Sequence, residues 1–221
     1  MTTQGDDRRM TSREVFRSAI LMFFFASGAA GLIYEVVWSR YLTTVFGATL
    51  PAISTVLAAF MGGLALGSLA LGRVADRLKR PLRLYGLLEL GIAVGALAVP
   101  LLLRIVEPLN HAVFGQFSEH FWLITLYRFA VNFFVLLLPT TLMGATLPIL
   151  SRFLVHRRTT LGLNIGSLYA ANTFGAVAGA ALCGFALIML LGVFGAMTVA
   201  VALNVIVCLL AVTLSSRIET T

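Results

Sequence analysis

The sequence predicts an all-α integral membrane protein with six transmembrane helices, and three observations lead to this class. Hydrophobic residues make up 59% of the 221 residues and charged residues only 11%, which leaves too little polar surface for a water-soluble globule. The mean hydropathy is +0.97. Apolar runs of about 20 residues, the length that crosses a bilayer core, recur along the chain.

The six predicted spans cover approximately residues 18–45, 50–72, 84–104, 121–150, 161–190 and 195–215. They form one transmembrane domain, 18–215, between a polar N-terminal tail, 1–17, which we expect to be frayed, and a C-terminal tail, 216–221. Pro139 and Pro148 interrupt the fourth run. A separate helix after Pro139 would be too short to cross, so we expect one kinked helix there.

The basic residues predict the orientation in the membrane. All but three of the 16 Lys and Arg residues lie in the two tails or in the loops after the second and fourth spans. Basic loops stay in the cytoplasm, so both termini are expected there, in a multi-pass protein of the cell (inner or plasma) membrane. The three exceptions are Arg40, Arg104 and Arg128.

The net charge of +7 does not indicate a nucleic-acid partner, because cytoplasmic loops account for it in a membrane chain. Cys183 and Cys208 lie inside apolar runs, where a thiol behaves as a small hydrophobic group, and no disulfide is expected. His111, His120 and His156 have no ligand spacing. We therefore expect neither a metal site nor a cofactor.

The loop after the second span carries a motif, Gly72-x-x-x-Asp76-Arg77-x-x-Arg80, that resembles the signature of the major facilitator superfamily between its second and third helices. Lys79 and Pro81 depart from the usual pattern. Transporters of that superfamily have twelve helices in two six-helix halves, so the resemblance implies one half of such a fold. Arg73 belongs to the same cytoplasmic loop.

A second resemblance covers nearly the whole chain. The segments "SGAAGLIYEVVWSR", "TVLAAFMGGLALGS", "PTTLMGATLPIL" and "GSLYAANTFGAVAG" are similar to the membrane portion of the spermidine-synthase-like membrane proteins. Their soluble synthase domain has no counterpart in this sequence. No strand, glycine turn and acidic residue follow one another as in a nucleotide site, so the chain is predicted not to be an enzyme.

Glycine pairs four residues apart predict close helix packing, since helices in lipid approach through small residues. For most pairs we expect contacts within the chain, and some pairs of the fifth span are candidates for contact with a second copy. The pairs are Gly63/Gly67, Gly91/Gly95, Gly162/Gly166 and Gly175/Gly179.

Ionisable side chains at membrane depth are the main functional candidates, because a charge there costs at least about 2.5–3.5 kcal/mol. Glu35 and Arg128 are both expected in the outer half of the membrane, and the facilitator resemblance places their helices around a central cavity. A closed Glu35–Arg128 or Glu35–Arg40 pair that only fixes packing is an equal alternative. Further polar residues that could line the cavity are Tyr34, Trp38, Asn132, Tyr169 and Asn172.

Glu89 is predicted to lie near the cytoplasmic interface and to pair with Arg77, Arg83 or another base of the loop. Asp76 has two possible roles. It either neutralises neighbouring bases of its own loop, or it approaches Leu161 to Asn164 of a second copy, where a helix N-terminus favours a carboxylate.

Two functions remain open. In the first, the chain is a half-size facilitator that acts as a homodimer around a shared cavity, with alternating access and a small-molecule substrate such as a polyamine, another amine or a zwitterion. In the second, it is the membrane anchor or partner subunit of a separate spermidine-synthase-like enzyme. We favour the first, because an anchor needs neither the signature loop nor the intramembrane charges.

Overall fold

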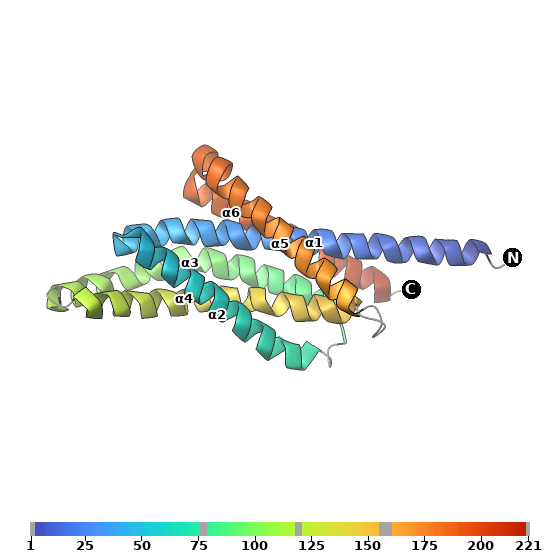
Figure 1. The fold of residues 1–221 in the computed structure, drawn as a ribbon, viewed down its shortest axis with the longest axis horizontal. Coiled ribbons are helices and arrows are strands. Elements are labelled where there is room, and N and C mark those ends of the chain that lie inside the picture. The colour runs from blue at the N-terminus through green and yellow to red at the C-terminus, as the bar shows by residue number, and fades with distance from the viewer. Residues whose placement is uncertain (1–2, 76–78, 118–120, 155–160, 220–221) are drawn as a thin grey trace.

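The computed structural model describes residues 3–75, 79–117, 121–154 and 161–219; all of these except residues 47–48 and 79–80 are helical, and none lies in a β-strand. The elements are α1 (Thr3–Phe46), α2 (Thr49–Ala75), α3 (Pro81–Phe117), α4 (Phe121–Leu154), α5 (Leu161–Leu182), the π-helical η2 (Cys183–Leu187) and α6 (Ile188–Glu219). Figure 1 shows the long helices running side by side, with α2 and α5 crossing the others at an angle.

Five helical segments are long and apolar enough to cross a membrane, which confirms an all-α, multi-pass membrane protein. The first four correspond to the first four predicted spans. The fifth and sixth predicted spans lie within one 56-residue segment. The five segments are Phe16–Phe46, Thr49–Arg73, Pro81–Leu109, Trp122–Leu154 and Gly162–Arg217.

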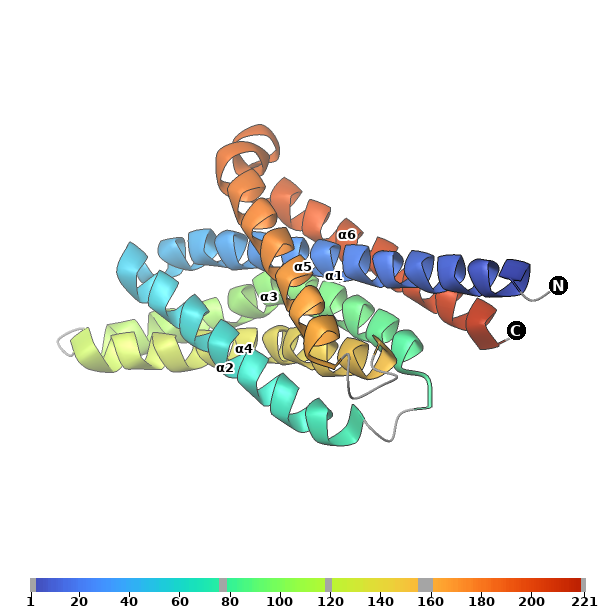
Figure 2. The same cartoon turned by 45° about the vertical axis from the view of Figure 1, so that its right-hand side comes forward.

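The last segment changes direction at Gly192. Its backbone has φ 73° and ψ 178°, inside what is otherwise continuous helix. Only glycine adopts this conformation readily, because it has no Cβ. Figures 1 and 2 show α5 rising away from the other helices and α6 returning beside α1 and α3.

Several helices extend beyond their predicted ends. The N-terminal tail, which was expected to be frayed, is helical from Thr3, and α6 continues to Glu219. The third helix continues to Phe117, although the prediction ended it at residue 104. Charged residues such as Arg104 interrupt the apolar run without ending the helix. Hydropathy therefore indicates only the part of a helix that lies in the membrane. The fourth helix is continuous through Pro139 and Pro148, as predicted.

The helix contacts follow an approximate two-fold pattern. The most extensive contacts join α2 to α4 and α5 to α1, and further contacts join α3 to α4, α6 to α1 and α3 to α6. Exchanging α1 with α4, α2 with α5 and α3 with α6 maps each of these contacts onto another of them or onto itself. The two halves of the chain, α1–α3 and α4–α6, therefore make equivalent contacts with each other.

The α2–α4 crossing depends on glycines that admit a neighbouring backbone. A Cβ added to Gly63 would overlap Thr140, and one added to Gly67 would overlap the carbonyl of Thr141. The hydroxyl of Thr140 donates to the carbonyl of Ala59 across the same crossing, at 3.0 Å. Gly63 and Gly67 therefore lie directly against α4 within the chain.

The α1–α5 crossing is equivalent. Added Cβ atoms at Gly175 and Gly179 would overlap the backbone of Phe25 and Ala29 on α1. Asn172 Nδ2 donates to the Phe24 carbonyl at 3.1 Å. Gly175 and Gly179 therefore pack within the chain.

Gly162 and Gly166, near the start of α5, have nothing within 4 Å of an added Cβ. They play no part in helix packing among the described residues. They are the members of the predicted glycine set that a second copy could contact.

Candidate functional site

A buried carboxylate lies where α3 crosses α6. Glu89 on α3 is 0% exposed and Asn204 on α6 is 1% exposed. The side-chain nitrogen of Asn204, Nδ2, donates to Glu89 Oε2. The amide oxygen of Asn204 accepts a 2.8 Å hydrogen bond from the Tyr34 hydroxyl on α1. Asn204 therefore links α1 to α3 through polar groups.

Two further hydroxyls complete this cluster. Tyr85 lies one turn before Glu89 on α3, so the two side chains share a face, and Ser27 comes from α1. Both hydroxyls lie close enough to interact with the Glu89 carboxyl. Neither Glu89 Oε1 nor the Tyr85 hydroxyl, however, has a hydrogen-bond partner with good geometry. We call Ser27, Tyr34, Tyr85, Glu89 and Asn204 the polar cluster.

Within the part of the chain that the structure describes, no basic residue lies at the depth of the polar cluster. The sequence contains no Lys, Arg or His in residues 18–39 of α1, 84–103 of α3, 129–151 of α4 or 188–216 of α6. Glu89 is therefore a carboxyl group in a low-dielectric interior, and no cation among the described side chains neighbours it. A group in this position is costly to ionise.

Aromatic side chains cover one side of the polar cluster. Trp38 stacks on Tyr34 with ring centroids 5.5 Å apart and an interplanar angle of 14°, and Phe60 also packs against Trp38. A small apolar hollow borders Trp38 and is also lined by Tyr41, Pro100 and Met197. This packing shields the hydrogen bonds of the polar cluster from lipid.

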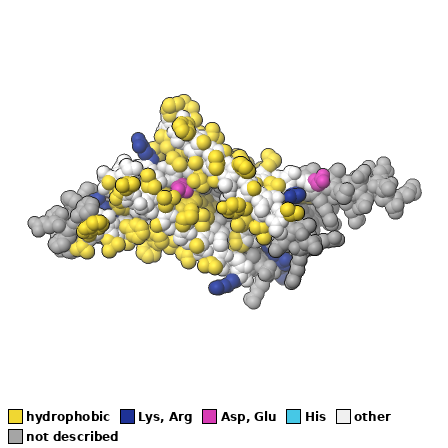
Figure 3. Space-filling model, in the orientation of Figure 1, with side chains coloured by type: hydrophobic (Ala, Val, Ile, Leu, Met, Phe, Trp, Pro, Cys, Tyr) yellow, Lys and Arg dark blue, Asp and Glu magenta, His cyan; other side chains and the backbone are white. Residues whose placement is uncertain are grey.

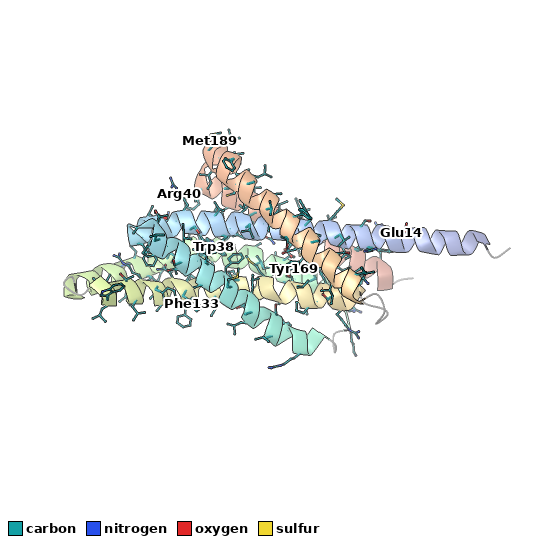
Figure 4. All side chains as sticks on the ribbon, in the orientation of Figure 1. Glu14, Trp38, Arg40, Phe133, Tyr169 and Met189 are labelled. Atoms are coloured by element: carbon teal, nitrogen blue, oxygen red, sulfur yellow. The ribbon has the colours of Figure 1, made fainter. Side chains whose placement is uncertain are left out.

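The predicted site residues are only partly brought together. Tyr34 and Trp38 are buried in the core. Asn132 is also buried, but its Nδ2 donates to the Arg128 carbonyl of its own helix at 2.6 Å. Tyr169 is 65% exposed and Arg40 is exposed. Figure 4 shows Trp38 within the bundle, whereas Arg40 and Tyr169 lie at its outside.

Glu35 and Arg128 are both half-buried, but no hydrogen bond or ion pair joins them. Their helices, α1 and α4, touch at few positions. Arg40 is likewise not paired with Glu35. Among the described residues, Glu35 has no polar partner, although it lies about three helical turns before the end of α1.

The predicted pairing of Glu89 with a loop base is wrong. The partner of Glu89 is Asn204, deep in the bundle, while Arg83 is exposed. Tyr85 and Glu89 face α1 and α6 because α3 packs against α6 at the small Gly86, whose added Cβ would lie 3.1 Å from the Cys208 carbonyl. This crossing turns that face of α3 inward.

The signature loop is described only in part. Gly72 and Arg73 are exposed at the end of α2, and Arg80 is exposed just before α3. Asp76 and Arg77 lie outside the described residues, so the two roles considered for Asp76 stay predictions. At the same end of the molecule, Arg17 of α1 donates to the Ser167 hydroxyl of α5 at 3.2 Å.

Sequence analysis missed Asn204, Tyr85 and Ser27. Asn204 carries a signal that could have identified it, because an amide in the middle of a long apolar run needs a partner inside the protein. Tyr85 and Ser27 carry no such signal, since hydroxyls bond to their own helix or reach the interface without cost. Their grouping depends on the helix crossing.

Comparison of the chain with protein-family models, with curated proteins and with solved structures finds no match. The fold and the polar cluster together define a class: a multi-pass helical membrane protein with a hydrogen-bonded carboxyl group at its centre.

Proposed function

We propose that the chain is half of a membrane transporter and that two copies form a cavity for a small amine or zwitterion. The half-buried Glu35, which lacks a polar partner among the described residues, is the observation on which this proposal rests. A carboxylate at membrane depth requires a partner. In this proposal the partner is substrate, or water in a cavity shared by the two copies.

The proposal treats the chain as having six crossings. The last apolar segment, 56 residues long, would extend about 84 Å as straight helix, against a hydrocarbon core of about 30 Å. The reversal at Gly192 supports two crossings of this segment. An even number of crossings puts both termini on one side, and the basic tails and loops favour the cytoplasm.

One face of the molecule is suited to contact a second copy. Figures 1 and 2 show α2 and α5 crossing in front of α1 and α4 on this face, and Figure 3 shows its surface to be mostly hydrophobic with few charges. Small exposed residues on the two helices permit close approach. They are Ser54, Ala65 and Gly72 on α2, Gly162, Gly166, Ala170, Thr173 and Ala181 on α5, and Gly184 on η2.

A two-fold axis along the membrane normal determines which helices meet. Rotation about this axis places the α2 edge of one copy opposite the α5 edge of the other, so the interface is formed twice by the same pair of helices. The helices between these edges, α1 and α4, then face the shared cavity. Glu35 belongs to α1.

Cysteine crosslinking tests the dimer. Ala65 and Ala170 are exposed and lie at similar distances from the basic end of α2 and α5. In a chain with Cys183 and Cys208 replaced, Ala65→Cys combined with Ala170→Cys should give an oxidised dimer. Val94→Cys, on the exposed side of α3, is the matched control and should remain monomeric. A monomeric particle mass in nanodiscs would refute the shared cavity.

Transport is tested with the purified protein in liposomes. Uptake of a labelled polyamine, a basic amino acid and a neutral amino acid is compared between the wild type and Glu35→Gln. We expect uptake of at least one probe to be lost in the variant while its thermal unfolding is unchanged. Full uptake by Glu35→Gln would remove Glu35 from the mechanism.

A role as anchor or partner subunit is the second candidate. The hollow beside Trp38 is small and apolar, so it offers no site for a polar substrate inside one chain. Lys79, Arg80, Arg83 and Arg152 are exposed at the basic end, where a soluble partner could dock. A monomeric mass together with absence of uptake would favour this candidate.

A further inference from the structure

We propose that the polar cluster is a proton-binding site, with the proton held on Glu89 Oε1 between α1, α3 and α6. This assignment goes beyond the transport proposal and does not depend on it, because it concerns a side chain that the proposed shared cavity does not use. The site lies where α3 and α6 pack together.

The first argument is the absence of a compensating charge. Glu89 is 0% exposed, and the four helices around it contain no basic residue at its depth. An ionised carboxylate in such a place carries a penalty of several kcal/mol even after relaxation. A carboxylic acid with hydrogen bonds does not carry this penalty.

The second argument concerns the two carboxyl oxygens. Oε2 accepts from Asn204, whereas Oε1 is buried without a completed hydrogen bond. A proton bound to Oε1 turns that oxygen into a donor, and the nearby hydroxyl oxygens of Tyr85 and Ser27 can accept. The Tyr85 hydroxyl is itself buried without a completed bond, so one proton can supply a partner to both groups.

The third argument is that the other titratable groups cannot neutralise Glu89. Those that face it are Tyr34 from α1, Tyr85 from α3 and Cys208 from α6, and each is neutral when protonated and negative when not. The α4 face contributes none between Arg128 and Arg152. Loss of the proton from Glu89 would therefore leave a net negative charge where α1, α3 and α6 meet.

The consequence is that proton release and helix packing are coupled. Asn204 holds α6 to both Tyr34 and Glu89, so a charge on Glu89 destabilises the packing of α1, α3 and α6 together. Loss of the proton from Glu89 is therefore expected to weaken the folded protein, because folding and proton binding are linked.

Infrared spectroscopy of the whole protein in nanodiscs tests the site directly. A protonated carboxyl group has a C=O stretching band that a carboxylate lacks, and glutamate labelled with ¹³C shifts that band, which distinguishes Glu from Asp. We expect a labelled band in the wild type at neutral pH, lost in Glu89→Gln and retained in the matched control Glu35→Gln. Tyr85→Phe should shift the band without removing it.

Two results would overturn the proposal. One is a wild-type protein without a protonated glutamate band at any pH at which it is folded, a result that needs no variant. The other is a band that disappears when Na⁺ is added at constant pH, since this would mean that the carboxylate binds a metal cation. Persistence of the band in a protein that neither dimerises nor transports would leave the proton site standing and remove only the transport proposal.

Thermal unfolding provides a second measurement. The midpoint of the wild type should fall as pH rises, and Glu89→Gln should lose this dependence, because its amide is neutral and keeps the shape of the acid. If Glu89→Gln does not fold, Asn204→Asp is the substitute. It adds a second carboxyl group beside Glu89, and its midpoint should fall more steeply with pH than that of the wild type. An unchanged pH dependence in the folded variant would contradict the assignment.

Discussion

Asn204 donates a hydrogen bond to Glu89 although the two residues are 115 positions apart in the chain. Through its amide oxygen Asn204 also accepts from Tyr34, at 2.8 Å. One amide side chain on α6 thus uses both of its polar atoms to hold a carboxyl group of α3 and a phenol of α1. This arrangement predicts which residue of the polar cluster contributes most to stability.

Replacing Asn204 should destabilise the protein more than replacing either of its partners alone. Asn204→Leu leaves two buried groups without this partner, and each unsatisfied group costs about 1–3 kcal/mol. Tyr34→Phe removes one hydroxyl and keeps the ring that stacks on Trp38, so its cost should be smaller. Thermal unfolding in detergent measures both.

The double variant provides the control. Because Tyr34 and Asn204 are in direct contact, their effects should be non-additive, with a coupling of about 0.5–3 kcal/mol. Strictly additive effects would mean that this hydrogen bond does not contribute to stability.

Glycines at the helix crossings should tolerate a larger side chain less well than glycines with open space around them. Gly67→Val and Gly179→Val each push a side chain into a backbone across a crossing, and overpacking costs typically about 1–3 kcal/mol. Gly166→Val is the matched control, since nothing lies within 4 Å of its added Cβ. We expect the first two to lower the midpoint of thermal unfolding and the control to leave it unchanged in a monomer.

Gly192 should be required for the reversal between α5 and α6. Its φ of 73° with ψ of 178° is a conformation that costs other residues about 1–3 kcal/mol. Gly192→Ala should therefore lower the free energy of unfolding by that amount. Gly184→Ala is the control, because Gly184 is helical with open space around it, and the same change there should be neutral or slightly stabilising.

Membrane orientation is tested by cysteine accessibility. With Cys183 and Cys208 replaced, Lys79→Cys and Thr3→Cys should react with an impermeant reagent only from the cytoplasmic side, and Gln116→Cys only from the opposite side, as basic loops require. Labelling of Lys79→Cys from outside alone would reverse the proposed topology. Equal labelling of all three from one side would contradict the crossing pattern.

Hydropathy was sufficient to identify the first four spans, because the bilayer demands long apolar runs regardless of how helices pack. Helix ends were less predictable. The apolar signal stops near Arg104 while α3 continues to Phe117, since a helix leaving the membrane keeps its own backbone hydrogen bonds. Glycine spacing also predicted close packing. Gly63 and Gly175 lie against a neighbouring helix whereas Gly166 does not, and spacing alone did not distinguish them.

The sequence by itself determined that this protein is an all-α, multi-pass membrane protein with helices that approach closely at glycines, because apolar length and small-residue spacing are local properties. Only the tertiary structure decided which polar groups meet. Glu89, Asn204 and Tyr34 come from three helices, and the rotation of each helix about its axis is set by packing against the others. A change in that rotation would turn Glu89 toward lipid or toward the loop bases. The sequence around residue 89 does not specify the rotation.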